Sequence, residues 1–121
     1  VASVMKASTV LVLASKWEGL PNVVLESQAA GLPVVASAFD GCQEVIEDGV
    51  TGRLFPTGDT ERLASVLREL LGSGDGSKAA AEQMRSRLAS SAREFAKSRF
   101  SWEKCVTEYD VLLRNLQSCQ T

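Results

Sequence analysis

The chain of 121 residues is long enough for one domain with a single modest core, because folding at this size buries roughly 60–70% of the surface of the unfolded chain. Its 13 basic and 15 acidic residues give a formal net charge of -2, without the basic excess typical of nucleic-acid binding, so we expect no nucleic-acid partner. No apolar run approaches the roughly 18–20 residues of a membrane span and nothing near Val1 resembles a signal peptide, which predicts a soluble, cytoplasmic protein.

The N-terminal half of the chain alternates predicted strands and helices. Continuous apolar, β-branched runs predict buried strands at residues 9–13 and 32–36, and a short strand is predicted at 53–55. Helical segments are predicted at 1–8, at 22–30 with Gly31 just past the end, and briefly at 42–46 before a turn at 47–52. The first two strands and the helix between them have the size of a βαβ crossover, so these strands are expected to be parallel.

The C-terminal half is predicted to contain three helices, each with an apolar stripe at helical spacing. The first begins at the candidate N-cap Asp59 and ends at Gly72, with a stripe of Leu63, Val66, Leu67, Leu70 and Leu71. After a flexible linker over 72–77, the second carries Ala81, Met84, Leu88, Ala92 and Phe95. The third begins at the candidate cap Ser101 and carries Trp102, Val106, Tyr109, Leu113 and Leu116. We interpret all three stripes as core.

These elements predict an α/β fold and one partial domain. Residues 1–71 are expected to form part of a Rossmann-like parallel sheet, and residues 78–117 the C-terminal helices that follow it. Three cysteines, Cys42, Cys105 and Cys119, are odd in number and widely spaced, which favours neither a disulfide framework nor a metal clip. We interpret them as ordinary thiols.

Two loops follow the first two predicted strands, at residues 15–21 and 37–41. Ligands of open parallel sheets bind beyond the carboxyl ends of the strands, and both loops are expected to emerge at that edge. Together they can form the walls of a cleft.

The helix after the first loop is expected to begin at about Asn22, because Pro21 suits a helix start. The opening amides, at Asn22 and Val23, have no acceptor within the helix and lie at the positive end of its dipole, which favours phosphate. The dipole contributes only about 0.3–1 kcal/mol at an exposed site, so cationic side chains are also needed.

Glu18 and Glu26 flank this expected anion site. A carboxylate accepts hydrogen bonds from adjacent sugar hydroxyls, and each such bond contributes about 1.5–3 kcal/mol. Glu26 shares a helix face with Val23 and Ala30, which predicts a partly buried carboxylate. The alternative is that Glu26 is only a favourable helix residue and Glu18 a solvated loop charge.

Several other residues near the two loops carry no specific prediction. Gly49 and Gly52 are interpreted as turn formers. The roles of Asp40, Glu44 and Asp48 are left open.

Two segments of the chain resemble the retaining GT-B glycosyltransferases of the large family that includes glycogen and sucrose synthases and bacterial lipopolysaccharide mannosyl- and glucosyltransferases. Residues 15–37 read SKWEGLPNVVLESQAAGLPVVAS and contain the family's two glutamates, separated by seven residues. Residues 41–55 read GCQEVIEDGVTGRLF. The glutamate pair alone is weak evidence, but the flanking Gly-Leu-Pro, the following strand and the Asp-Gly-Val-Thr-Gly turn make the resemblance specific.

The resemblance implies a role for each matching residue. Glu18, at the catalytic position, is expected to contact the donor sugar ring, and Glu26 the ribose of the nucleotide. Backbone amides are expected to hold the sugar hydroxyls and the diphosphate, at Gly19, Leu20, Pro21, Asn22 and Val23, of which Pro21 contributes only its place in the loop because it has no amide hydrogen. Members of the family use no metal and no cofactor, transfer a hexose from a nucleotide diphosphate sugar to a hydroxyl acceptor, and retain the anomeric configuration.

The sequence departs from the family pattern at Thr9, where an aspartate is usual, at Ala14, where a proline is usual, and at Asp40, where a glycine is common. Asp40 adds a negative charge near the expected diphosphate. The arginine and lysine that hold the diphosphate, and the acceptor-binding N-terminal domain, are expected upstream of Val1. We therefore expect this chain alone to be inactive.

Three other functions are compatible with the residues. The first is a non-catalytic module that binds nucleotide sugars, and the second is a truncated relic that folds and binds nothing. The third is a related GT-B-like epimerase, whose additional acidic and histidine residues are expected outside this segment. The donor base and sugar, the acceptor and the oligomeric state are not readable from these residues.

Overall fold

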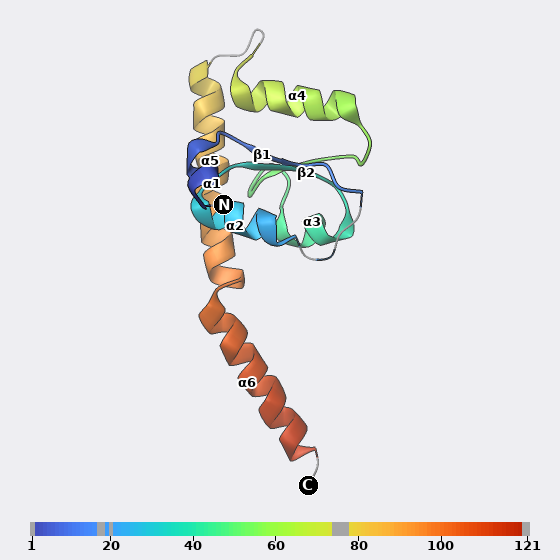
Figure 1. Ribbon diagram of the computed structural model, residues 1–121, viewed down its shortest axis with the longest axis vertical. Coiled ribbons are helices and arrows are strands. Elements are labelled where there is room, and N and C mark those ends of the chain that lie inside the picture. The colour runs from blue at the N-terminus through green and yellow to red at the C-terminus, as the bar shows by residue number, and fades with distance from the viewer. Residues whose placement is uncertain (1, 17–18, 20, 74–77, 120–121) are drawn as a thin grey trace.

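A three-stranded parallel sheet forms the centre of the computed structural model, which describes residues 2–16, 19, 21–73 and 78–119 (Figure 1). The strands are β1 (Leu11–Leu13), β2 (Val34–Ser37) and β3 (Arg53–Phe55). The helices are α1 (Ala2–Ala7), α2 (Asn22–Ala30), α3 (Asp40–Val45), α4 (Thr60–Leu71), α5 (Lys78–Arg99) and α6 (Trp102–Ser118). The predicted α/β fold with a parallel sheet is confirmed.

The strand order in the sheet is β1-β2-β3, so β2 lies in the middle. Leu11 pairs with Val34, and Val35 pairs with Arg53. All four residues of β2 are buried, as expected for a strand that is covered on both faces. The strand begins at Val34 rather than Leu32, after Pro33, whose ring nitrogen has no hydrogen to donate to a neighbouring strand.

Helices cover the two faces of the sheet and form two apolar clusters. One cluster lies between the sheet, α2 and α3 and consists of Val24, Val34, Ala36, Phe39, Cys42, Val45 and Ile46. The other lies between the sheet, α4 and α5 and consists of Val35, Phe55, Val66, Leu70 and Leu88. The stripes predicted for α4 and α5 therefore supply core residues, although Leu71 is exposed.

The ends of these helices follow the local sequence signals. An Asp59 carboxylate oxygen accepts from the Arg62 N–H at 2.9 Å, and the Ser101 hydroxyl accepts from the Lys104 N–H at 3.2 Å. Gly31 and Gly72 end α2 and α4 with φ values of 77° and 71°, in the left-handed region that favours glycine. Both predicted N-caps and both predicted glycine ends are confirmed.

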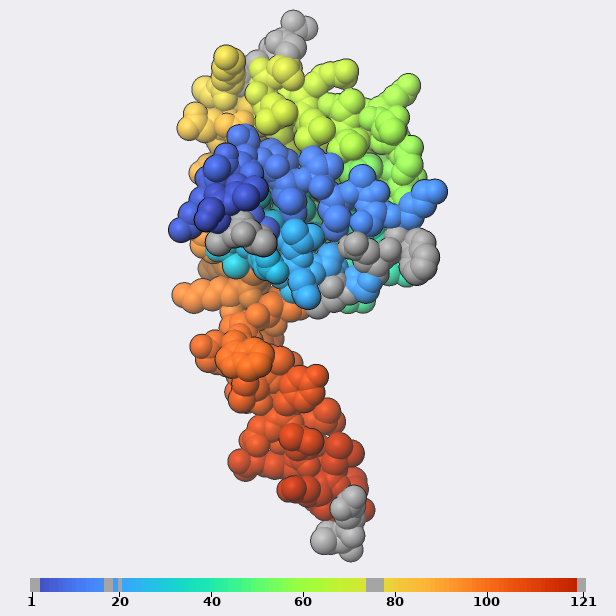
Figure 2. Space-filling view, viewed as in Figure 1, coloured from blue at the N-terminus to red at the C-terminus, as the bar shows by residue number. Residues whose placement is uncertain are grey.

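The interpretation of the third stripe as core is wrong. α6 extends away from the sheet, and its apolar side chains are exposed (Figures 1 and 2). The exposed fractions are 77% for Trp102, 62% for Tyr109 and 58% for Leu113, and no residue of α6 is buried. The spacing correctly predicted an amphipathic helix, but spacing does not specify what covers the apolar face. None of the helices among the described residues is both long and apolar enough to cross a membrane.

Candidate functional site

The loops that follow β1 and β2 meet at the carboxyl edge of the sheet. The Ser37 hydroxyl, at the end of β2, donates to the Ser15 carbonyl in the loop after β1. A side-chain carbon added at Gly41 would overlap the Gly19 carbonyl oxygen, so the two backbones are in direct contact there. The predicted common edge is therefore confirmed for the described part of both loops. α5 runs past the opposite end of the strands and leaves this edge open (Figure 1).

The N-terminus of α2 opens at this edge without a side-chain cap. Pro21 occupies the position before the helix with extended backbone, and its carbonyl accepts from the Val24 N–H at 3.1 Å. The N–H groups of Asn22 and Val23 have no acceptor among the described residues, and no acidic side chain lies in the first turn of α2. These two amides can bind an anion, because they carry the positive end of the helix dipole.

The structure describes most of the residues predicted to bind the donor. Gly19 and Asn22 are exposed, Val23 is half-buried and Pro21 is buried. A side-chain carbon added at Gly19 would have no other residue's atom within 4 Å, so the space beside Gly19 is open. Glu18 and Leu20 lie outside the described residues.

The prediction that Glu26 is partly buried is wrong, because its side chain is exposed. The buried face of α2 carries Val24, Ser27 and Gln28. Helical residues one position apart point about 100° away from each other, so Glu26 cannot share this face with Ser27. Two of the three buried residues are polar, and the apolar pattern of the sequence therefore did not identify the buried face.

Gln28 holds α2 in place and the buried Ser27 hydroxyl is satisfied within the helix, and sequence reasoning missed both. The Gln28 side-chain amide donates to the Val45 carbonyl at 2.8 Å and so links α2 to the end of α3. The Ser27 hydroxyl donates to the Val23 carbonyl at 2.8 Å. Their spacing from Val24, at three and four residues, is the signal that indicates a shared face.

Asp48, whose role was left open, has a structural role. Its carboxylate accepts from the Leu54 N–H at 2.9 Å and lies 3.5 Å from the Arg53 Nε. Arg53 also pairs with Glu69 of α4 at 2.8 Å. Asp40 and Glu44 are exposed on α3. Within the described ranges, no three His, Cys, Asp or Glu side chains are arranged as a metal site requires.

A hollow of about 650 Å³ lies at the opposite edge of the sheet, between α1, the end of α2, and α5. Lys6 lies in the last turn of α1, and the Arg93 guanidinium lies against Gly31 at the end of α2. Cations at helix C-termini offset the negative end of the helix dipole. Arg85, the third cation that lines the hollow, donates to the Leu70 carbonyl in the last turn of α4. These contacts account for all three cations without a ligand.

Comparisons with known proteins connect this geometry to a family. Residues 1–73 match the protein family described as glycosyl transferases of group 1. An uncharacterized glycosyltransferase of Methanocaldococcus jannaschii is 35% identical over 88% of this chain and 28% of its own length. A D-inositol 3-phosphate glycosyltransferase of Saccharomonospora viridis is 37% identical over 84% of this chain and 22% of its own length.

Solved structures of larger proteins contain the same fold. Sucrose-phosphate synthase from Thermosynechococcus elongatus matches with a TM-score of 0.84 and 28% identity, over 96% of this chain and 27% of the other. Anabaena HepE, in complex with UDP-glucose, matches with a TM-score of 0.76 and 28% identity, over 95% of this chain and 29% of the other. The chain thus spans less than a third of the length of each of these relatives and neighbours.

Proposed function

This chain belongs to the glycosyl transferases of group 1, and we propose that it forms part of the domain that binds the sugar donor, a nucleotide diphosphate sugar. The observation that carries the proposal is the uncapped N-terminus of α2 at the open edge of the sheet, where the amides of Asn22 and Val23 have no acceptor among the described residues. An anion there gains two hydrogen bonds and the favourable end of the helix dipole. The match to HepE, a structure that contains UDP-glucose, supports this choice of ligand.

Each donor-binding residue has a distinct proposed role. The amides from Gly19 to Val23 bind the diphosphate and the sugar hydroxyls. Glu18 contacts the sugar ring, and Glu26 accepts hydrogen bonds from the ribose. The exposure of Glu26 supports its role, because a solvated carboxylate on the second turn of α2 is accessible to a ligand that binds at the start of the same helix.

The proposed reaction of the longer protein is transfer of a hexose from the donor to a hydroxyl acceptor, with retention of configuration and without a metal or another cofactor. The proposed anion site lies at the N-terminus of α2, but the described residues near this site include no cationic pair that could neutralise a diphosphate. Lys16 is the nearest cation in the chain order, and it is exposed. We therefore propose that other parts of the longer protein supply the cations and the acceptor site, and that this chain alone does not catalyse transfer.

The apolar face of α6 supports the proposal that further protein packs on this chain. We define this face as Trp102, Val106, Tyr109, Leu112, Leu113 and Leu116, all of them exposed. The match to sucrose-phosphate synthase covers 96% of this chain, too much to leave α6 out, and only 27% of the larger protein. We propose that the remainder of the longer protein, which includes the acceptor-binding domain, covers the α6 face.

Titration with UDP-glucose, monitored by amide NMR of the chain, tests donor binding. We expect millimolar UDP-glucose to shift the amides of Gly19, Asn22 and Val23, and inorganic phosphate to shift only the last two. No change at these amides with any nucleotide diphosphate sugar would favour the relic that binds nothing. Binding without transfer by the longer protein would favour the non-catalytic module, and inversion of the donor sugar would favour the epimerase.

The substitution Glu26→Gln tests the ribose contact. We expect about a tenfold or greater loss of donor affinity, because a charge-assisted hydrogen bond is replaced by a neutral one. Stability should change little, since the side chain is exposed. Glu44→Gln is the matched control, because it removes the same charge from an exposed site on α3. Equal donor affinity in the two variants would contradict the proposed role of Glu26.

A further inference from the structure

The segment that joins β2 to α3 is fixed to the sheet. The Ala38 N–H donates to the Phe55 carbonyl at the end of β3, at 2.8 Å, and the Phe39 N–H donates to the Ser37 carbonyl at 2.9 Å. The Phe39 side chain is buried in the core cluster beside α3. This segment can therefore act as a rigid support for a neighbouring loop.

The Ser37 hydroxyl makes the first contact between this support and the loop after β1. The side chain is 1% exposed, and its hydroxyl donates to the Ser15 carbonyl, with the Leu13 carbonyl 3.4 Å away as a weaker acceptor. When a buried hydroxyl loses the carbonyl to which it donates, the folded state is destabilised. The bond therefore favours one position of Ser15 relative to β2.

Gly41 makes the second contact. Its backbone is not in the left-handed region, so glycine is not needed there for its conformational freedom. Glycine is needed for space, because a side-chain carbon at residue 41 would overlap the Gly19 carbonyl oxygen and lie 3.2 Å from the Phe39 ring. Gly41 thus lets the start of α3 approach the same loop near its far end.

We propose that Ser37 and Gly41 are positioning residues, which hold the loop between β1 and α2 at Ser15 and at Gly19 so that the loop presents its amides to the donor. The inference rests on the proposed function, because it assumes that the loop binds the donor. Neither residue needs to touch the ligand, since each acts through a carbonyl of the loop. Preorganised binding groups are more effective than groups that must be ordered at the moment of binding.

Donor affinity of four variants tests the proposal. Ser37→Ala removes the hydroxyl, and we expect the dissociation constant for UDP-glucose to rise about three- to tenfold, the effect of one hydrogen bond. Ser37→Thr keeps the hydroxyl and should bind as the wild type does. Gly41→Ala displaces the Gly19 carbonyl and should weaken binding at least as much as Ser37→Ala. The control is Thr51→Val, which removes a buried hydroxyl that accepts from the Glu47 N–H at 2.8 Å in the turn before β3.

Backbone order without any donor separates this inference from the proposed function. We expect Ser37→Ala and Gly41→Ala to lower the NMR order parameters of Ser15, Lys16 and Gly19, and Thr51→Val to leave them unchanged. If the wild type does not bind UDP-glucose, the proposed function fails, whereas the order parameters still decide whether the loop is held. Wild-type order parameters in both Ser37→Ala and Gly41→Ala would overturn the positioning role, and if one of these variants does not fold, the other decides.

Discussion

At the scale of single residues, the polar side chains of this chain divide into those that build the fold and those that are open to a ligand. Asp48 and Gln28 hydrogen-bond to backbone groups of neighbouring segments, and Ser27 to a carbonyl one turn back in its own helix. Glu26 and Asn22 are exposed beside the open edge of the sheet. A polar side chain in a sequence does not by itself reveal which of these roles it has, because both require the same chemical groups. The role of a polar side chain depends on the group to which it hydrogen-bonds, and the side chain's own sequence position does not identify that group.

The substitution Asp48→Ala should destabilise the chain. It removes the acceptor of the Leu54 N–H and one of the two carboxylates that pair with Arg53. We expect the free energy of unfolding to fall by about 1–2 kcal/mol. This is the contribution of a hydrogen bond to a charged group, lowered because the Asp48 side chain is exposed to solvent. Urea denaturation measures the loss. Glu47→Ala is the control, since this neighbouring acidic residue is exposed, and a similar loss there would show that the effect is not specific to Asp48.

At the scale of elements, the sequence predicted which segments form helices and strands better than it predicted how they are covered. The apolar run of β2 is buried at every residue, as expected for a strand covered on both faces. The equally apolar run at residues 9–13 was predicted to be buried too, but this prediction is wrong for β1, in which Val12 is 41% exposed. The N-caps Asp59 and Ser101 could also be predicted, because an N-cap side chain hydrogen-bonds to a backbone N–H only two or three residues away. The apolar stripes of α5 and α6 look alike in sequence, yet one contributes buried Leu88 and the other lies in solvent. The difference depends on contacts between distant segments, which helical spacing does not contain.

Two leucines on these helices should respond differently to truncation. Leu88→Ala leaves a cavity in the cluster between the sheet, α4 and α5, and we expect it to lower the free energy of unfolding by about 2–5 kcal/mol. Leu113→Ala on α6 should change it by less than about 0.5 kcal/mol, because Leu113 is 58% exposed. Thermal or urea denaturation of the isolated chain compares them. A loss for Leu113→Ala as large as that for Leu88→Ala would indicate that the α6 face is covered in the isolated chain.

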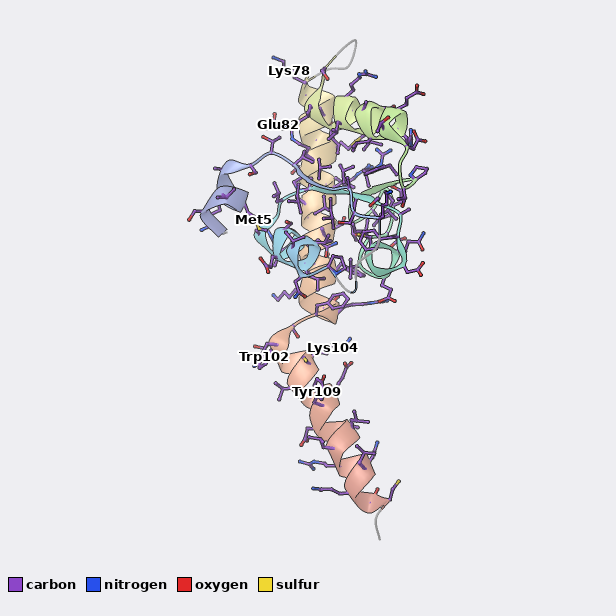
Figure 3. All side chains as sticks on the ribbon, turned by 45° about the vertical axis from the view of Figure 1, so that its right-hand side comes forward. Met5, Lys78, Glu82, Trp102, Lys104 and Tyr109 are labelled. Carbon is purple, nitrogen blue, oxygen red and sulfur yellow. The ribbon has the colours of Figure 1, made fainter. Side chains whose placement is uncertain are left out.

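At the scale of the whole molecule, the chain has one covered end of the sheet, one open end, and a helix that projects from the body. α6 has 17 residues, so it is about 26 Å long. Figure 3 shows Trp102 and Tyr109 along this helix, away from the sheet. The sequence predicted correctly that the loops after β1 and β2 meet at one edge, because parallel strands bring their carboxyl ends to the same edge. It could not predict the projection of α6, because the residues proposed to cover this helix are not in the chain.

Trp102 provides an optical test of this arrangement. In a Trp17→Phe background, we expect the isolated chain to show tryptophan emission close to that of the free amino acid in water, because Trp102 is 77% exposed. In the longer protein, the same residue should emit at shorter wavelength and be less accessible to iodide quenching. Identical emission and quenching in the two proteins would contradict the proposal that the remainder of the protein covers the α6 face.

The placement of the cysteines gives the exposed helix a chemical consequence. Cys105 lies on α6 and Cys119 just after it, both exposed, whereas Cys42 is buried in α3. A thiol reagent that does not enter the folded core should therefore modify two sulfur atoms quickly and the third only when the sheet opens. In a longer protein, slower labelling of Cys105 with unchanged labelling of Cys42 would show that α6 has become covered. The chain thus carries an internal reporter of its own assembly, which mass spectrometry could detect in a crude cell extract.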